Sequence, residues 1–332
     1  MTYRHKRVLV LGATGTIGQA TTRALIRAGY DVTCLLRDAN ASPSPERENS
    51  LGSMSEEVTV RFGTVTDYDS LRDNGFCGER FDVLISCIAS RNGSAKDAWA
   101  VDYQANLNAL EIAKELGVAH FILVSAICVQ NPKLEFQFAK LAFEKELIKS
   151  GIKYSIVRPT AYFKSLSGQI KRLKNDKPFL LFGDGRLTSC KPISDSDLGQ
   201  FVTDAINDPT CHNRILPIGG PGPAITPRDQ GEHLFKLLGK PPKYKQIPVR
   251  LLDVVIGFLS IAGRVFPNLN DKAEFARIAK YYATESMLVM DCKTKLYDEN
   301  ATPSTGNETL FDFYSKLIQH GESVELGDHS VF

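Results

Sequence analysis

Three glycines, Gly12, Gly15 and Gly18, follow the apolar run 7–11 and open an amphipathic stretch over residues 16–28. A strand, a glycine-rich turn and a helix in this order build an anion site from backbone alone, because the helix start offers unpaired N–H groups and a positive dipole end. Gly12 permits the tight turn, Gly15 lets the chain approach a pyrophosphate, and Gly18 lets the helix lie close to its strand. The motif predicts a dinucleotide site; a turn needed only for folding is the alternative.

The whole turn is expected to contact the cofactor, through Gly12, Thr14, Gly15, Thr16, Ile17 and Gly18. Its G-x-x-G-x-x-G spacing differs from the G-x-G-x-x-G fingerprint. It resembles instead the turn of the extended and atypical (NmrA-like) short-chain dehydrogenase/reductases. This resemblance implies an α/β fold with a Rossmann-type doubly wound parallel sheet.

Short apolar runs alternate with helical patterns in the first half, which predicts a parallel sheet with right-handed crossovers. We expect strands over residues 7–11, 31–36, 58–62, 82–88, 120–125 and 153–158, and helices near 16–28, 101–116 and 135–149. The polar segment 38–57 contains Pro43, Pro45 and several serines, and we expect a mobile surface loop there.

After about residue 160 strand-like and helical segments are mixed. Strands are expected over 179–182 and 215–218, and helices near 195–207, 227–238, 249–265, 271–283 and 307–319. We therefore predict an NADP-binding domain over residues 1–160 and a mainly helical substrate-binding portion over 161–332. The second portion should pack at the edge of the sheet where the strands end, since doubly wound folds bind ligands there.

Composition excludes several classes of function. The 332 residues carry 40 basic and 38 acidic side chains without a basic block, so nothing indicates nucleic-acid binding. Seven scattered cysteines form no C-x-x-C pair, which favours free thiols in a reducing compartment, and we find no metal-ligand spacing.

The N-terminus runs directly into the first expected strand, which leaves no room for a signal or transit peptide and predicts a cytoplasmic protein. No run of 18 apolar residues occurs, so no membrane-spanning helix is expected. The closest stretch, 251–266, carries Asp253 and Arg264 and is expected to form a buried or interfacial amphipathic helix. Peripheral membrane contact through 249–266 is therefore an option.

The choice of nicotinamide cofactor depends on Arg37, nineteen residues beyond Gly18 at the end of the second expected strand. NAD sites usually place a carboxylate near this point, whereas arginine suits the 2′-phosphate of NADP. We predict NADPH, although Asp38 is adjacent and Arg37 could be a solvated surface charge. Asp67 lies where an adenine-side contact would fall, and its alternative role is a helix cap.

The catalytic region departs from the short-chain reductases. In that family a serine ends the fifth strand and Tyr-x-x-x-Lys follows on a helix, with both side chains on one face. Here Ser125 ends the strand, and Phe136 and Lys140 take the other two positions. The resemblance implies that Lys140 binds the nicotinamide ribose and that Pro159 lies beside the cofactor. A plain strand-end serine and a surface lysine are the alternatives for Ser125 and Lys140.

The missing phenol at position 136 has a chemical consequence. A ketone or alcohol needs proton transfer at oxygen, which the family tyrosine supplies. A conjugated carbon–carbon double bond does not, because the charge spreads into the conjugated system and a proton arrives separately. Phe136 also offers a flat apolar face to an aromatic substrate. The opposite inference is a non-catalytic, NADP(H)-binding regulator.

The second half carries a closer resemblance in the stretches 182–185, 190–194, 216–227, 230–232, 234–235 and 279–287. Together they resemble the NADPH-dependent divinyl chlorophyllide 8-vinyl reductases of the plant type, whose plant members carry a transit peptide. The resemblance implies reduction of the 8-vinyl group of divinyl chlorophyllide or protochlorophyllide to ethyl, a step of chlorophyll or bacteriochlorophyll biosynthesis. The magnesium then belongs to the substrate. An NADPH-dependent reductase of another conjugated aromatic substrate is the nearest enzymatic alternative.

In the implied mechanism Lys140 adds positive charge beside the developing anion. The macrocycle lies between the nicotinamide and the second half, with residues 249–266, Tyr162 and Phe163 as walls or as ordinary core. The proton donor stays open among Tyr162, Cys190, Lys191 and water. The sequence gives no oligomeric state.

Overall fold

The computed structural model describes residues 5–319 except 38–48, 92, 265 and 267. Its centre is a seven-stranded sheet in the order β3-β2-β1-β4-β5-β6-β8, and every neighbouring pair is parallel. The strands are β1 (Arg7–Leu11), β2 (Asp31–Arg37), β3 (Thr59–Gly63), β4 (Val83–Ser86), β5 (His120–Val124), β6 (Lys153–Pro159) and β8 (Arg214–Ile218). The predicted doubly wound sheet is confirmed.

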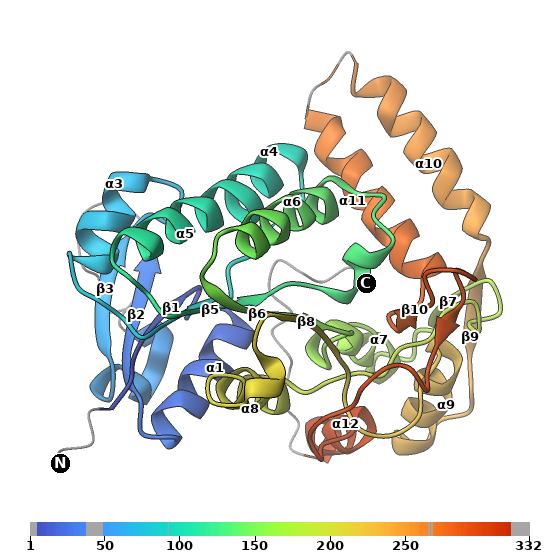
Figure 1. Ribbon diagram of the computed structural model, residues 1–332. Coiled ribbons are helices and arrows are strands. Elements are labelled where there is room, and N and C mark those ends of the chain that lie inside the picture. Colours follow the sequence, from blue (N-terminus) through green and yellow to red (C-terminus); the bar gives the residue numbers. More distant parts are fainter. Residues whose placement is uncertain (1–4, 38–48, 92, 265, 267, 320–332) are drawn as a thin grey trace.

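Helices cover both faces of the sheet, which explains why its strands are apolar on both sides. Figure 1 shows α4 (Ala95–Ala98), α5 (Asn106–Glu115) and α6 (Glu135–Lys149) on one face, with α1 (Thr16–Arg27) and α8 (Asp195–Asp204) on the other. Along β1, Val8 and Val10 belong to the core beneath α1 and α8. Leu9 and Leu11 belong to the core beneath α5 and α6.

The second half of the chain returns to this sheet. The chain leaves it after β6, and α8 and β8 then bring a helix and a strand back. Gly199 of α8 lies so close to α1 that a Cβ there would stand 2.6 Å from the carbonyl carbon of Ala20. The boundary expected at residue 160 thus marks where the chain first departs from the sheet.

The remaining elements pack around a third core that includes Phe163, Phe235 and Tyr314. They are α7 (Ile170–Lys174), β7 (Phe179–Phe182), α9 (Pro227–Leu237), β9 (Tyr244–Ile247), α11 (Asn268–Thr284), β10 (Val289–Met290), β11 (Tyr297–Asp298) and α12 (Leu310–Gln319). β7 pairs with β9 in parallel, and β10 pairs with β11 in antiparallel fashion. Figure 1 shows this group on the right, beyond the ends of β5 and β6.

The segment expected to be a surface loop differs in part from the prediction. Residues 38–48 lie outside the described residues. Residues 49–56 were expected in the same loop but form the 3₁₀ turns η1 (Asn49–Glu56). Leu51 and Met54 are 2% and 6% exposed and join the core beneath α1. The prediction is wrong there, because a kink at Gly52 separates two short turns and each turn places one apolar side chain in the core.

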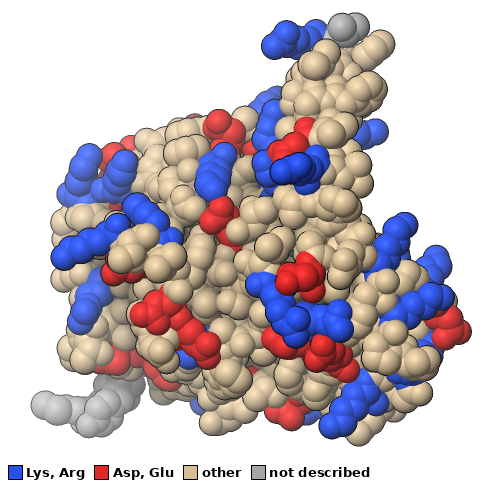
Figure 2. All heavy atoms as spheres, turned by 90° about the vertical axis from the view of Figure 1, so that its right-hand side faces the viewer, with Lys and Arg blue, Asp and Glu red and all other residues tan. Residues whose placement is uncertain are grey.

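The helix α10 (Val249–Ala262) contains no buried residue, so the buried alternative for this helix is wrong. With α11 it forms a projecting hairpin, which Figure 2 shows as mostly uncharged surface with basic side chains at its tip. Leu251, Val254, Phe258 and Ile261 are 51%, 67%, 71% and 68% exposed, and their spacing places them on one face. Across the described ranges, no helix combines the length and apolarity that a membrane crossing requires.

Candidate active site

The glycine turn between β1 and α1 has the geometry that an anion site requires. Gly12 has a φ of +79°, and a Cβ there would stand 2.8 Å from the carbonyl carbon of Cys87. A Cβ on Gly18 would stand 2.0 Å from the carbonyl oxygen of Gly12. Neither position accepts a side chain without moving backbone, so glycine at both is what brings strand, turn and helix together. Thr14 and Gly15 are exposed, which leaves the turn open to a ligand.

The N-terminus of α1 has no side-chain cap. Gly15 occupies its N-cap and provides no side-chain bond, and no acid lies in its first turn. The first backbone N–H groups of a helix, here those of Thr16, Ile17 and Gly18, have no partner within the helix. By contrast Ser194 and Thr226 cap α8 and α9 with their hydroxyl groups. The turn therefore fits a pyrophosphate group, which would supply the missing acceptors.

Two residues predicted for the adenosine side lie at the same edge of the sheet. Arg37 ends β2 opposite Gly63 of β3 and is exposed. Asp67 follows β3, and its carboxylate accepts a hydrogen bond from the Ser70 N–H at 2.8 Å. Asp67 therefore caps α3 (Tyr68–Ser70), which is the alternative role considered for it. Contacts of Arg37 and Asp67 with a cofactor stay predictions.

Lys140 is held in place by an acid that the sequence analysis did not identify. Its Nζ lies 2.8 Å from Oδ1 of Asp102, and the two side chains are 11% and 0% exposed. Asp102 belongs to the π-helical segment η3 (Trp99–Ala105) that precedes α5. Its Oδ2 is buried and has no hydrogen-bond partner in the described part of the chain. Phe136, one turn before Lys140, is half-buried and packs against the third core.

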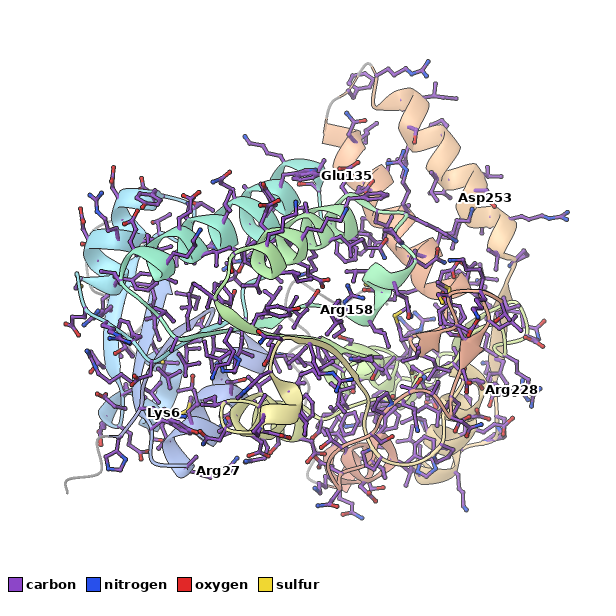
Figure 3. The ribbon with its side chains drawn as sticks, viewed as in Figure 1. Lys6, Arg27, Glu135, Arg158, Arg228 and Asp253 are labelled. Atoms are coloured by element: carbon purple, nitrogen blue, oxygen red, sulfur yellow. The ribbon has the colours of Figure 1, made fainter. Side chains whose placement is uncertain are left out.

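Ser125 is committed to a buried network beside this pair. Its Oγ donates to Oε1 of Glu144 at 2.6 Å. The Arg158 guanidinium donates to both oxygens of the same carboxylate, at 3.1 Å from Nε and by a second bond from Nη2. Figure 3 shows Arg158 beneath α6, near the end of β6. This arrangement favours the structural alternative for Ser125, because its hydroxyl proton is already used.

Two of the proton donors left open by the sequence have other partners. Cys190 lies in a short strand-like bridge, and burial raises the pKa of its thiol to about 12. The Lys191 ammonium donates to the carbonyl oxygen of Thr302 at 3.3 Å. Burial therefore disfavours ionisation of the Cys190 thiol, one of the three Lys191 N–H donors is occupied, and a proton-donor role for either group stays a prediction.

Tyr162 does lie near the glycine turn. It follows β6, in which Pro159 pairs with Ile218 of β8. Burial raises the pKa of its phenol, and Cys87 and Cys128 are its ionisable neighbours. Since the backbone of Cys87 also touches Gly12, Tyr162 stands between the turn and the 3₁₀ segment η4 (Ile127–Gln130).

A second phenol reaches the site from α11. The Tyr281 hydroxyl donates to the carbonyl oxygens of Cys128 and Asn131, at 2.9 and 3.0 Å, which fastens α11 to η4. The next residue, Tyr282, hydrogen-bonds with the Cys128 thiol, and Tyr162 is another neighbour. The sequence analysis used residues 279–287 only as a resemblance and assigned no role to Tyr282. Two adjacent tyrosines in that stretch were the available signal.

The model of the NmrA-like family matches residues 4–305. The divinyl chlorophyllide a 8-vinyl-reductase of Arabidopsis thaliana is 45% identical over 332 residues, covering 97% of this chain and 79% of the relative. The enzyme of the same name from Oryza sativa subsp. indica is 45% identical over 331 residues, covering 98% and 82%.

Among solved structures, leucoanthocyanidin reductase from Vitis vinifera with NADPH superposes with a TM-score of 0.67. It is 16% identical and covers 94% of this chain and 99% of that one, a likeness that concerns the fold alone. The family match and the plant relatives carry the assignment further. The chain belongs to the NmrA-like family and, within it, to the family of the divinyl chlorophyllide a 8-vinyl-reductases.

Proposed function

We propose that this protein reduces the 8-vinyl group of divinyl chlorophyllide or protochlorophyllide to ethyl, with NADPH as the donor. The observation that carries the proposal is the 45% identity to the plant enzymes of that name over 97% of the chain. The open, uncapped turn of α1 supports it, because a pyrophosphate would complete that turn.

NADPH would supply a hydride. The backbone of residues 12–18 would bind the pyrophosphate of NADPH. Arg37 would contact its 2′-phosphate, Asp67 would lie toward the adenosine, and Pro159 would lie beside the nicotinamide. Lys140 would bind the nicotinamide ribose, and Asp102 would hold the Lys140 ammonium in place, since the two groups are paired in the structure. The places of residues 12–18, Arg37, Asp67 and Pro159 support these assignments, because each lies at or shortly after the carboxyl end of a strand.

The side chain at position 136 fits an alkene substrate better than a ketone. Phe136 presents no proton donor at the place where the short-chain reductases have their phenol. The charge that develops during reduction of a vinyl group spreads over the macrocycle, and the ammonium of Lys140 would stabilise it. Residues 161–332 outside the sheet would form most of the macrocycle site.

We also propose peripheral contact with a photosynthetic membrane from the cytoplasmic side. The apolar face of α10 supports this, since Leu251, Val254, Phe258 and Ile261 are all more than half exposed. Exposed Arg250 and Arg264 flank that face, and such a pattern suits an anionic lipid surface.

Sedimentation with vesicles of anionic phospholipid tests the membrane contact. Val254→Ser with Phe258→Ser should abolish co-sedimentation. Leu296→Ser is the matched control, because Leu296 is 69% exposed but lies outside α10. Equal sedimentation of both variants would exclude α10 as the contact.

The enzymatic proposal is tested by mixing purified protein with NADPH and divinyl chlorophyllide. We expect a shift of the pigment absorbance to that of the monovinyl form, with one NADPH consumed per vinyl group. Tight NADPH binding without turnover would identify a regulator instead. Turnover of a small conjugated aromatic compound with none of the pigment would identify the other reductase class.

A further inference from the structure

We propose that the Tyr282 hydroxyl is the acid that protonates the reduced vinyl group. This inference rests on the proposed function. It assigns to α11 the proton-donating role that position 136 of α6 lacks. Tyr282 would thus be a catalytic residue supplied by the second half of the chain.

The position of α11 against the sheet is fixed beside this residue. Tyr281 is 4% exposed and donates to two carbonyl oxygens of the segment that follows β5. Its ring and that of Tyr282 meet edge to face, with centroids 5.8 Å apart. The Tyr281 anchor therefore holds the neighbouring phenol at a defined place rather than in solvent.

The surroundings of Tyr282 belong to the predicted cofactor site. Its hydroxyl hydrogen-bonds with the Cys128 thiol, and Tyr162 is close by. Burial raises the pKa of that thiol, while the nearby positive charge of Lys140 acts in the opposite direction. Cys128 therefore connects Tyr282 on α11 to Lys140 on α6, and Tyr162 connects the same cluster to the turn at Gly12.

Other donors near this cluster are already engaged. Ser125 donates its only O–H to a buried carboxylate, and Lys191 uses one of its N–H groups on a backbone carbonyl. The Tyr282 hydroxyl, by contrast, meets the Cys128 thiol, whose sulfur is a weak acceptor. Tyr162 is packed against the core beneath α1 and α8. Tyr282 is half-buried and lies on α11, outside the sheet, so the proposal places the substrate against this helix.

The reaction balances with one phenol proton. Hydride from NADPH forms a C–H bond at the terminal vinyl carbon, and the π pair moves to the inner carbon and the macrocycle. That pair then takes the proton from Oη of Tyr282 and forms the second C–H bond. The vinyl group is reduced, NADPH is oxidised, and the phenolate regains a proton from solvent. Burial keeps the pKa of Tyr282 well above its usual value, so the phenol carries its proton at neutral pH.

The test compares Tyr282→Phe, Tyr162→Phe and the wild type in single turnovers of divinyl chlorophyllide. We expect Tyr282→Phe to slow product formation by at least about 100-fold, the lower end for loss of a general acid. Its NADPH affinity, measured by fluorescence, should stay within about threefold of the wild type. Tyr244→Phe is the matched control, since it removes a buried hydroxyl on β9 that has no hydrogen-bond partner among the described residues.

A readout without substrate accompanies the kinetics. Urea denaturation of the free protein should show Tyr282→Phe to be as stable as Tyr244→Phe, so that slow turnover cannot be attributed to loss of the fold. Wild-type rates in Tyr282→Phe, or a large loss in Tyr162→Phe alone, would overturn the assignment while leaving the proposed function intact. A wild-type protein that does not reduce the vinyl group would instead overturn the proposed function.

Discussion

Two buried ion pairs on the same helix differ in how completely they are satisfied. Lys140 and Glu144 lie four residues apart on α6 and therefore on one face. The Glu144 carboxylate accepts from Ser125 and twice from Arg158, and its side chain is 2% exposed. The Lys140 pair is open in comparison, because Oδ2 of Asp102 lacks a partner among the described residues.

This difference indicates that the Glu144 network stabilises the fold, whereas the Lys140–Asp102 pair is a candidate for ligand binding. The Glu144 network ties the end of β5, α6 and β6 together, and both oxygens of the Glu144 carboxylate already accept hydrogen bonds. A buried polar group without a partner costs free energy unless something completes it. The partnerless Oδ2 of Asp102 therefore supports the prediction that a ligand binds at the Lys140–Asp102 pair, and four variants can test this contrast.

The largest effect should come from Glu144→Ala. It leaves the Arg158 charge without its partner, and such a loss lowers the free energy of unfolding by about 3–5 kcal/mol. Urea denaturation measures it. Glu146→Ala on the same helix is the control, since that side chain is 42% exposed. A loss no larger than that of the control would mean that the network is not a scaffold.

Lys140→Met should reduce turnover by at least about 100-fold, which corresponds to roughly 2.7 kcal/mol, and weaken NADPH binding. Stopped-flow kinetics and fluorescence titration measure the two effects. Adding Asp102→Asn should restore stability, because it removes the unpaired buried carboxylate, but it should not restore turnover. Lys149→Met, at a side chain 71% exposed, is the control. Turnover and cofactor affinity near the wild-type values would remove Lys140 from the site.

Ser125→Ala tests whether Ser125 stabilises the fold and takes no part in the reaction. One hydrogen bond to a charged acceptor is lost, so the free energy of unfolding should fall by about 1.5–3 kcal/mol. Turnover per folded molecule should stay within about threefold, which is far below the effect of losing a catalytic acid or base. The opposite result, unchanged stability with a hundredfold slower reaction, would return Ser125 to the catalytic residues.

The smallest effect is a change of stability with pH, which we expect from the buried neutral imidazole of His120 at the start of β5. His120 is 1% exposed, its Nε2 lies 2.9 Å from Ser155 Oγ, and burial lowers its pKa to about 3. Lys153, His212 and Lys6 act in the same direction.

The unfolded chain binds a proton at His120 near pH 6.5 and the folded chain does not until about pH 3. Stability from this residue is therefore complete above pH 6.5 and falls as the pH drops toward 3, by about 1 kcal/mol per pH unit. Urea denaturation at pH 6 and pH 5 measures the slope, and His120→Gln should flatten it. An unchanged slope would show that other groups dominate.

The sequence was sufficient to predict the strands and the glycine turn, because these depend on residues close together in the chain. Strands buried on both faces appear as apolar runs, and glycines 12, 15 and 18 define the turn by their spacing. The partners of the site could not be predicted in this way. Asp102 meets Lys140, and Tyr281 meets Cys128, only because parallel crossovers bring distant segments to one edge of the sheet. The burial of Leu51 and Met54, which lie in a polar segment, likewise depends on contacts with residues distant in the sequence.

The place of β8 in the sheet also has a consequence for synthesis of the chain. A nascent fragment that ends at residue 160 has an open β6 edge, because β8 pairs there, and an uncovered α1, because α8 packs on it. The glycine turn thus leaves the ribosome long before α8, which packs beside α1, has been synthesised. Exposed strand edges promote association with other chains, so a truncated fragment is expected to aggregate, and the two halves must fold together.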